Sequence, residues 1–251
     1  VCIGNIYIGG TGKTPLTIFI ANKLKNLGKQ PVIVRKFYKE HNDEYGLIKD
    51  KFEDFILNTS RIKSIREAEN SKYDCVILDD GFQDLSIHKN FNIICFNGDK
   101  LIGNGMVLPS GPLRDNLNSL KSAHVIIING ERNVNFENKI LRINNDLEFF
   151  YSRYKPTNAE EFIGKKLLAI AGIGNPDNFF KLLIKNNLNI EKKIVYPDHY
   201  VFTKNEILNI VNEANSKNYQ IIMTEKDYYK IKDFNILEIK YLKINLEINQ
   251  S

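Results

Sequence analysis

Short apolar runs alternate with segments of helical periodicity through the first half of the chain. Five runs are rich in Ile and Val, namely 1–6, 31–35, 73–81, 91–98 and 123–130. Runs of this length predict strands, and their continuous apolar character predicts burial on both faces. The pattern therefore indicates a parallel sheet with helices on both sides, which is an α/β fold.

Helical segments separate several of these runs. Pro15 begins an apolar-periodic segment that ends at Gly28, a pattern typical of a helix from its first turn to its C-cap. Residues 61–70 also show helical spacing. Residues 36–46 are polar instead, and we expect a loop there.

A second α/β set follows a polar, less regular joining stretch at 131–165. Apolar runs at 165–173 and 220–227 predict two further buried strands, and the segments after Pro176 and Lys204 predict helices. The tail alternates like an edge strand, and we expect it to return and pair with the joining stretch. The sequence therefore predicts two α/β domains, with the boundary at residue 150.

The 251-residue chain has an ordinary composition for a folded protein, with 43% hydrophobic and 26% charged residues. Its three cysteines exclude a disulfide scaffold and favour a reducing compartment. The net charge of +5 comes from scattered lysines rather than a basic stripe, so we expect no nucleic-acid partner. No apolar run reaches the roughly 18 residues of a membrane span. Because the chain begins inside a predicted strand, we expect further residues upstream.

The most informative motif is a glycine-rich segment between the first strand and the first helix. It comprises Tyr7, Ile8, Gly9, Gly10, Thr11, Gly12, Lys13 and Thr14. In such a P-loop, main-chain N–H groups wrap around phosphate oxygens, the lysine reaches the β- and γ-phosphates of ATP, and the Thr14 hydroxyl binds Mg²⁺. Tyr7 stands where the strict motif has glycine, so a glycine-rich turn that binds nothing is the alternative.

Two adjacent carboxylates, Asp79 and Asp80, end the predicted strand at 73–81. P-loop enzymes place a carboxylate at such a strand end to hold Mg²⁺, directly or through water. Adjacent like charges also repel unless a cation offsets them. We therefore interpret both as metal-site candidates, with an ordinary Asp-Asp-Gly turn as the alternative. The charged residues at the strand end 225–227 we interpret as structural ion pairs.

Seven segments, in this order, resemble the tetraacyldisaccharide 4'-kinase family over nearly the whole chain. They are GNIYIGGTGKTP, VILDDGFQ, NGMVLPSGPLRD, VIIING, AIAGIGNPDNFF, VYPDHYVFT and IIMTEKDYYKI. The resemblance implies transfer of the γ-phosphoryl group of ATP, with Mg²⁺, to the 4'-hydroxyl of an acylated glucosamine disaccharide phosphate in lipid A biosynthesis. It also implies a P-loop, parallel-sheet kinase domain at 1–150 and a smaller α/β domain at 151–251, joined by a two-stranded linker.

The resemblance also implies a place in the cell. Members of the family associate with the cytoplasmic face of the bacterial inner membrane, partly through an amino-terminal helix that would lie upstream of Val1. We therefore expect peripheral contact with membrane lipid.

Carried over by motif, the resemblance implies roles for five further residues. Asp43 is the implied base for the sugar hydroxyl, Glu44 helps to hold the metal, and His199 pairs with Asp43 when the domains close. Arg35 is what remains of the family's Ser-Arg-Gly-Tyr-Gly segment, and it and Arg114 are implied to hold the substrate. Without the resemblance, Asp43 and Glu44 would be a solvated loop pair and His199 a turn histidine.

Two other functions fit the same motifs. A P-loop ATPase or another small-molecule kinase would use the glycine-rich loop and the Asp-Asp-Gly turn without a role for Asp43 or His199. A nucleotide-gated regulator would bind ATP without transferring phosphate, and Tyr7 and the altered segment at 34–40 fit that function. Transfer of label from ATP to lipid separates the three.

Overall fold

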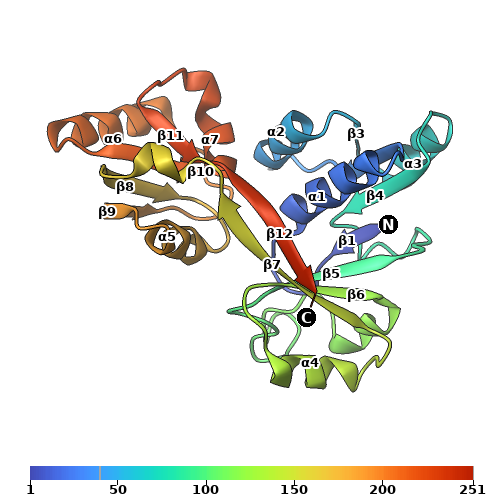
Figure 1. Cartoon of the computed structure of the whole chain (residues 1–251). Coiled ribbons are helices and arrows are strands. Elements are labelled where there is room, and N and C mark those ends of the chain that lie inside the picture. Colours follow the sequence, from blue (N-terminus) through green and yellow to red (C-terminus); the bar gives the residue numbers. More distant parts are fainter. Residues whose placement is uncertain (40, 251) are drawn as a thin grey trace. The chain divides into compact units, whose positions relative to one another are not determined.

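The structure is a computed structural model that describes residues 1–39 and 41–250, apart from the side chains of 42, 43 and 250. Contacts divide the chain into two compact units (Figure 1). Unit 1 comprises Val1–Tyr38, Ile48–Arg153 and Leu246–Ser251, and unit 2 comprises Lys39–Leu47 and Tyr154–Asn245. Each unit is built around a sheet with helices packed against it.

The five strands predicted in the first half lie in one sheet. They are β1 (Cys2–Gly4), β2 (Pro31–Lys36), β4 (Cys75–Asp79), β5 (Asn92–Asn97) and β6 (Val125–Asn129). With β3 (Phe55–Asn58), β7 (Glu148–Pro156) and β12 (Ile244–Gln250), they form the order β12-β7-β6-β5-β1-β4-β2-β3. Neighbouring strands from β3 to β7 pair in parallel, which confirms the predicted parallel sheet. The carboxyl ends of β1, β2 and β4 therefore meet at one edge.

Alternate residues of these strands pack into two separate cores. Cys2 of β1 and Val32 and Val34 of β2 belong to one core, whereas Ile3 and Ile33 belong to the other. Because both faces of the sheet are covered, both sets of side chains are apolar. This burial explains why the strands read as continuous apolar runs.

The helices of the first half are α1 (Lys13–Asn26), α2 (Asn42–Lys51), α3 (Arg61–Glu69) and α4 (Val134–Leu141). The expected loop at 36–46 is wrong in its second half, because α2 begins there. Tyr45, Ile48 and Phe52 are buried and lie at helical spacing, so the segment has an apolar side that packs. Most of the other residues of α2 are polar or charged, and they hid the periodicity in the sequence.

Unit 2 repeats the same architecture on a smaller scale. Its strands are β8 (Lys166–Ala171), β9 (Asn189–Val195), β10 (Gln220–Thr224) and β11 (Ile239–Leu242), in the order β11-β10-β8-β9 with parallel pairing. Its helices are α5 (Pro176–Lys185), α6 (Lys204–Ser216) and α7 (Glu225–Ile231). Leu168 and Ile170 of β8 enter one core and Leu167 and Ala169 the other, as in the larger sheet.

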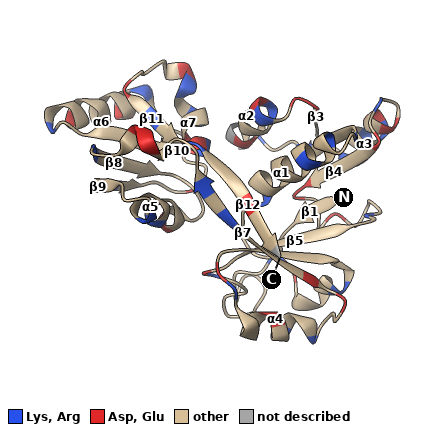
Figure 2. Ribbon diagram, in the orientation of Figure 1, with Lys and Arg blue, Asp and Glu red and all other residues tan. Residues whose placement is uncertain are grey.

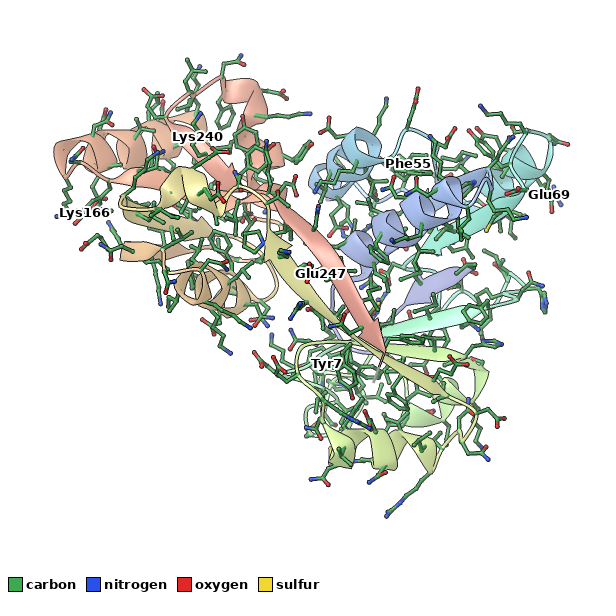
Figure 3. The ribbon with its side chains drawn as sticks, in the orientation of Figure 1. Tyr7, Phe55, Glu69, Lys166, Lys240 and Glu247 are labelled. Atoms are coloured by element: carbon green, nitrogen blue, oxygen red, sulfur yellow. The ribbon has the colours of Figure 1, made fainter. Side chains whose placement is uncertain are left out.

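Two strands, β7 and β12, have residues in both units and are neighbours in the larger sheet (Figure 1). Arg153 of β7 forms an ion pair of 2.9 Å with Glu247 of β12. Figure 3 labels Glu247 on that strand. The expectation that the tail returns to pair with the joining stretch is confirmed. Basic and acidic residues are interspersed over the helices of both units, so the net charge of +5 is not gathered on one element (Figure 2).

Candidate functional site

The P-loop segment joins β1 to α1 as a wrapped main-chain turn. Gly9, Gly10 and Gly12 have φ angles of 63°, 55° and 86°, which residues with a β-carbon rarely adopt. Gly12 caps α1 through its backbone, and the first helical turn reads Lys-Thr-Pro-Leu. The N–H groups and the dipole of this helix start are therefore arranged for an anion.

Buried polar contacts hold the loop in this shape. The Asn5 side-chain amide donates to the Tyr7 carbonyl at 2.7 Å and to the Thr11 hydroxyl at 2.9 Å. The Ile8 N–H donates to the Pro112 carbonyl at 3.0 Å. Asn5 is fully buried, and sequence reasoning missed it. Its only signal is an amide side chain at the end of a buried strand, where packing alone would favour an apolar residue.

Asp79, at the end of β4, forms a buried cluster with the start of α1 and the end of β2. Its Oδ2 accepts from the Thr14 hydroxyl at 3.3 Å and from the Arg35 guanidinium at 2.5 Å. Its Oδ1 accepts from the Thr17 hydroxyl at 3.1 Å. Asp79 is 0% exposed and Arg35 is 4% exposed, so both charges are buried. Arg35, expected to hold the substrate, thus contacts Asp79 and Thr14, which were expected to hold the metal, and Thr17 is an addition that the sequence did not indicate.

Asp80 has different partners from its neighbour. It adopts a φ of 56°, and its Oδ1 lies 3.6 Å from Lys13 Nζ and 2.7 Å from Arg114 Nη1. Arg114 also donates to Asn5 Oδ1 at 2.9 Å. Burial raises the pKa of the Asp80 carboxyl, but the charges of Lys13 and Arg114 outweigh burial and hold the pKa well below its usual range. Each of the two adjacent carboxylates therefore has its own cation.

The donor chemistry at this strand edge fits Mg²⁺. The Thr14 hydroxyl and the Asp79 carboxylate are hard oxygen donors only 3.3 Å apart, with Asp80 as the next residue. In phosphoryl-transfer enzymes Mg²⁺ binds to one or two carboxylates together with the phosphates of the substrate. Such a site needs no cage of three or more His, Cys, Asp or Glu side chains, and the described side chains form none.

Unit 2 contains a second polar cluster of His41, Glu44, Asp198, His199 and Lys226. The Lys226 ammonium lies 2.9 Å from Glu44 and 3.1 Å from Asp198. The rings of His41 and His199 stack with their centroids 4.5 Å apart and an interplanar angle of 10°. His199 has a φ of 58°, and its main-chain N–H donates to the Asp198 carboxylate at 3.0 Å. The structure therefore brings Glu44 and His199 into one cluster, with Lys226 as a shared cation.

Asp43, the expected base, lies in the first turn of α2 next to Glu44, and its side chain falls outside the described residues. Lys226 also belongs to this cluster, although the sequence analysis interpreted it only as part of a structural ion pair. The sequence signal for it is a charged triplet at the end of a buried strand. Nothing local in that triplet names Glu44 as a partner, because the two residues come from distant segments.

Asp227, the next residue, has a structural environment. It is fully buried, and its carboxylate accepts from the Gly172 N–H at 2.8 Å and the Thr224 hydroxyl at 2.6 Å. Lys230 Nζ lies 2.7 Å from its other oxygen. Thr224 in turn accepts from the Asp227 N–H at 3.1 Å and caps α7. These contacts support a structural role for Asp227.

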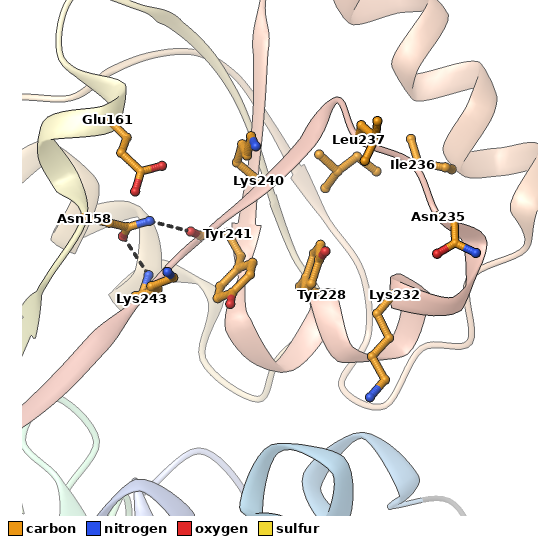
Figure 4. Close-up of a pocket in the computed structure, with 11 residues that line it drawn as sticks. Asn158, Glu161, Tyr228, Lys232, Asn235, Ile236, Leu237, Lys240, Tyr241 and Lys243 are labelled. Atoms are coloured by element: carbon orange, nitrogen blue, oxygen red, sulfur yellow. Dashed lines mark hydrogen bonds between the residues drawn. The ribbon is translucent and has the colours of Figure 1, made fainter. Parts of the chain in front are cut away.

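A cavity of about 270 Å³ lies in unit 2 beside β11 and α7 (Figure 4). The rings of Tyr228 and Tyr241 stack at 4.4 Å along one side. Asn158 donates to the Tyr241 carbonyl at 3.1 Å and accepts from the Lys243 N–H at 2.8 Å, as the dashed lines in Figure 4 show. The residues that line it are not among those predicted for the active site.

No helix formed by the described residues combines the length and the apolar character that crossing a membrane requires.

Comparison with known proteins identifies the family. Residues 1–251 match the family described as tetraacyldisaccharide-1-P 4'-kinase. The tetraacyldisaccharide 4'-kinase of Pelagibacter ubique is 40% identical over 252 residues, which cover 99% of this chain and 80% of that protein. The enzyme of the same name from Rickettsia conorii is 33% identical over 267 residues, which cover 99% and 81%.

A solved structure shares the fold. The crystal structure of the "apo" form of LpxK from Aquifex aeolicus in complex with ATP aligns with a TM-score of 0.70 at 20% identity, covering 99% of this chain and 83% of that one. The predicted α/β fold with a mostly parallel sheet is thereby confirmed. With the family match over its whole length, the chain belongs to the tetraacyldisaccharide-1-P 4'-kinase family.

Proposed function

We propose that this chain transfers the γ-phosphoryl group of ATP to the 4'-hydroxyl of a tetraacyldisaccharide 1-phosphate in lipid A biosynthesis. The observation that carries the proposal is the nucleotide end of unit 1, where a wrapped loop ends in Lys13 and Thr14 beside Asp80 and Asp79. Phosphoryl transfer depends mainly on positioning and charge neutralisation. This arrangement can supply both.

In the proposal, the main-chain N–H groups of residues 8–14 bind the ATP phosphates. Lys13 lies 3.6 Å from Asp80, a separation that leaves its ammonium able to turn to a phosphate oxygen. Thr14 and Asp79 would hold Mg²⁺, with Asp80 beside them. Bound there, Mg²⁺ neutralises charge on the β- and γ-phosphates.

The acceptor side of the reaction is assigned to Asp43 and His199. Asp43 takes the proton of the attacking hydroxyl, and His199 supports it. Lys226 holds Glu44 and Asp198 by ion pairs of 2.9 and 3.1 Å, so it positions the segments that carry Asp43 and His199. Glu44 therefore acts within this cluster in our proposal rather than as a metal ligand.

The substrate phosphate is assigned to Arg114. Its side chain is 32% exposed, and its bonds to Asp80 and Asn5 orient the guanidinium at the P-loop edge. We place the reaction at a membrane surface, because a tetraacylated acceptor resides in lipid, and at the cytoplasmic face of the bacterial inner membrane, because the family resemblance implies that face. Contact of this chain with membrane lipid would then be peripheral.

One assay tests the proposal and its two alternatives. The chain is incubated with γ-labelled ATP, Mg²⁺ and the tetraacyldisaccharide 1-phosphate in detergent micelles, with Lys13→Ala as the control. Label in the lipid fraction, lost in Lys13→Ala, is the expected result. Release of labelled phosphate without labelled lipid would instead identify an ATPase. ATP binding without either product would identify a regulator, and both results contradict the proposal.

A further inference from the structure

The guanidinium of Arg35 binds the two oxygens that the proposed function assigns to Mg²⁺. Arg35 lies near the end of β2, opposite Asp79 of β4 in the parallel register. Its Nη1 donates to Asp79 Oδ2 at 2.5 Å and to the Thr14 hydroxyl at 3.2 Å. The hydroxyl and that carboxylate oxygen are 3.3 Å apart, so one nitrogen bridges both.

Burial makes this contact important for the charge of the site. Asp79 is 0% exposed and Arg35 is 4% exposed. A buried carboxylate without a paired cation strongly destabilises the folded protein. Among the described side chains, Lys13 and Arg114 pair with the adjacent Asp80 instead. Arg35 is therefore the cation hydrogen-bonded to Asp79 in this structure.

We propose that Arg35 is an exchangeable counter-ion of the metal site, which neutralises Asp79 in the nucleotide-free protein and leaves Asp79 and Thr14 when Mg²⁺ binds with nucleotide. The inference rests on the proposed function, because it takes Thr14 and Asp79 as metal ligands. A guanidinium and a divalent ion on the same two oxygens would place two cations next to each other in a buried site, where they repel. Metal binding therefore requires displacement of Arg35.

The exchange couples the metal to the nucleotide. A metal ion that arrives alone must displace Arg35 and offers that guanidinium no new partner. A metal ion that arrives with ATP brings phosphate oxygens, which are ligands for the ion and strong acceptors for a displaced guanidinium. Arg35 thus acts as a positioning residue that lowers the affinity for free metal and makes metal and nucleotide bind cooperatively.

Binding of Mn²⁺ to the full chain without nucleotide, followed by electron paramagnetic resonance, tests the exchange. Mn²⁺ prefers the same oxygen ligands as Mg²⁺. Arg35→Met removes the competing charge, and we expect it to bind Mn²⁺ at least about tenfold more tightly than the wild type. Arg35→Lys keeps a cation and stays near the wild type. The matched control is Arg153→Met, which removes an arginine from the exposed ion pair with Glu247 and leaves Mn²⁺ affinity unchanged.

Thermal unfolding gives a second readout that does not depend on activity. Without metal, Arg35→Met leaves Asp79 buried without this cation, so its melting temperature falls below that of the wild type. Millimolar Mg²⁺ then raises the melting temperature of Arg35→Met by about 5 °C or more, and that of the wild type far less. If Arg35 had only a structural role, Arg35→Met would show the same lower melting temperature, but Mg²⁺ would not raise it.

Two results overturn the proposal: an affinity of Arg35→Met for Mn²⁺ within about twofold of the wild type, or a melting temperature that Mg²⁺ does not raise. If Arg35→Met does not fold, the exchange is tested in the wild type by NMR of its arginine side chains. Comparison with Arg35→Lys assigns the Arg35 signals. The Arg35 signals should move when Mg²⁺ and a non-hydrolysable ATP analogue are added together. Signals that do not move, or that move equally with the analogue in EDTA, overturn the exchange.

The outcome of the kinase assay is independent of the outcome of these measurements. A chain that shows the Mn²⁺ and melting results but labels no lipid would keep the role of Arg35 and lose the proposed acceptor. A chain that labels lipid but shows no change in Mn²⁺ affinity in Arg35→Met would keep the kinase and lose the exchange.

Discussion

Replacing Asp227 with asparagine tests whether the buried carboxylate of unit 2 is required for its stability. The carboxylate accepts from the Gly172 N–H at 2.8 Å, the Thr224 hydroxyl at 2.6 Å and the Lys230 ammonium at 2.7 Å. Asparagine has nearly the same volume but only one acceptor oxygen, and its NH₂ group must face a donor. The Lys230 side chain, 8% exposed, would also lose the charge that balances it.

The magnitude follows from these contacts. Hydrogen bonds to a charged group contribute about 1.5–3 kcal/mol each, and breaking a buried ion pair from one side costs about 3–5 kcal/mol. The two estimates describe overlapping interactions, so we take about 3–5 kcal/mol as the loss from Asp227→Asn. Because whole domains are stable by about 5–15 kcal/mol, this substitution should bring unit 2 close to unfolding.

Urea denaturation followed by far-UV circular dichroism measures the loss, because the chain has no tryptophan for fluorescence. ATP affinity, measured by calorimetry in buffer, reports on the P-loop of unit 1 and should stay near the wild type. Asp233→Asn is the matched control, since Asp233 is exposed and should change stability by less than about 0.5 kcal/mol. A loss below about 1 kcal/mol for Asp227→Asn would refute the reasoning, because the buried pair would then contribute little net stability.

Three further predictions follow from the sites. Lys13→Ala and Asp43→Ala should each lower turnover in the lipid-labelling assay at least about 100-fold, since both act on the transferring group; near-normal turnover in either would remove that residue from the reaction. His199→Ala should cost about tenfold because it supports the base, and wild-type turnover would exclude it. Burial raises the pKa of the Cys2 thiol to about 11 and that of Cys95 to about 12, so below those values few thiolates form. Mass spectrometry after iodoacetamide treatment at pH 8 should find both unmodified in the folded chain, and rapid labelling of either would contradict its burial.

Much of the fold could be predicted because burial leaves a local trace. Strands covered on both faces, such as β5 and β6, must be apolar at successive positions, and that pattern is visible without a structure. Elements that leave only a weak trace were missed. β3 (Phe55–Asn58) has only four residues with mixed burial, and α2 carries its buried Tyr45, Leu47 and Ile48 in a segment that is otherwise mostly polar.

The sequence by itself determined the P-loop and the Asp79-Asp80 strand end, because each is a run of consecutive residues whose chemistry depends on local backbone geometry. Only the tertiary structure decided which cations hold those carboxylates. Arg35 contacts Asp79 because the parallel register of β2 and β4 places them side by side. Lys226 contacts Glu44 because the first residues of α2 belong to unit 2, which also contains Lys226. Such partners lie far apart along the chain, and sheet register and packing bring them together, so no local pattern of residues encodes the contact.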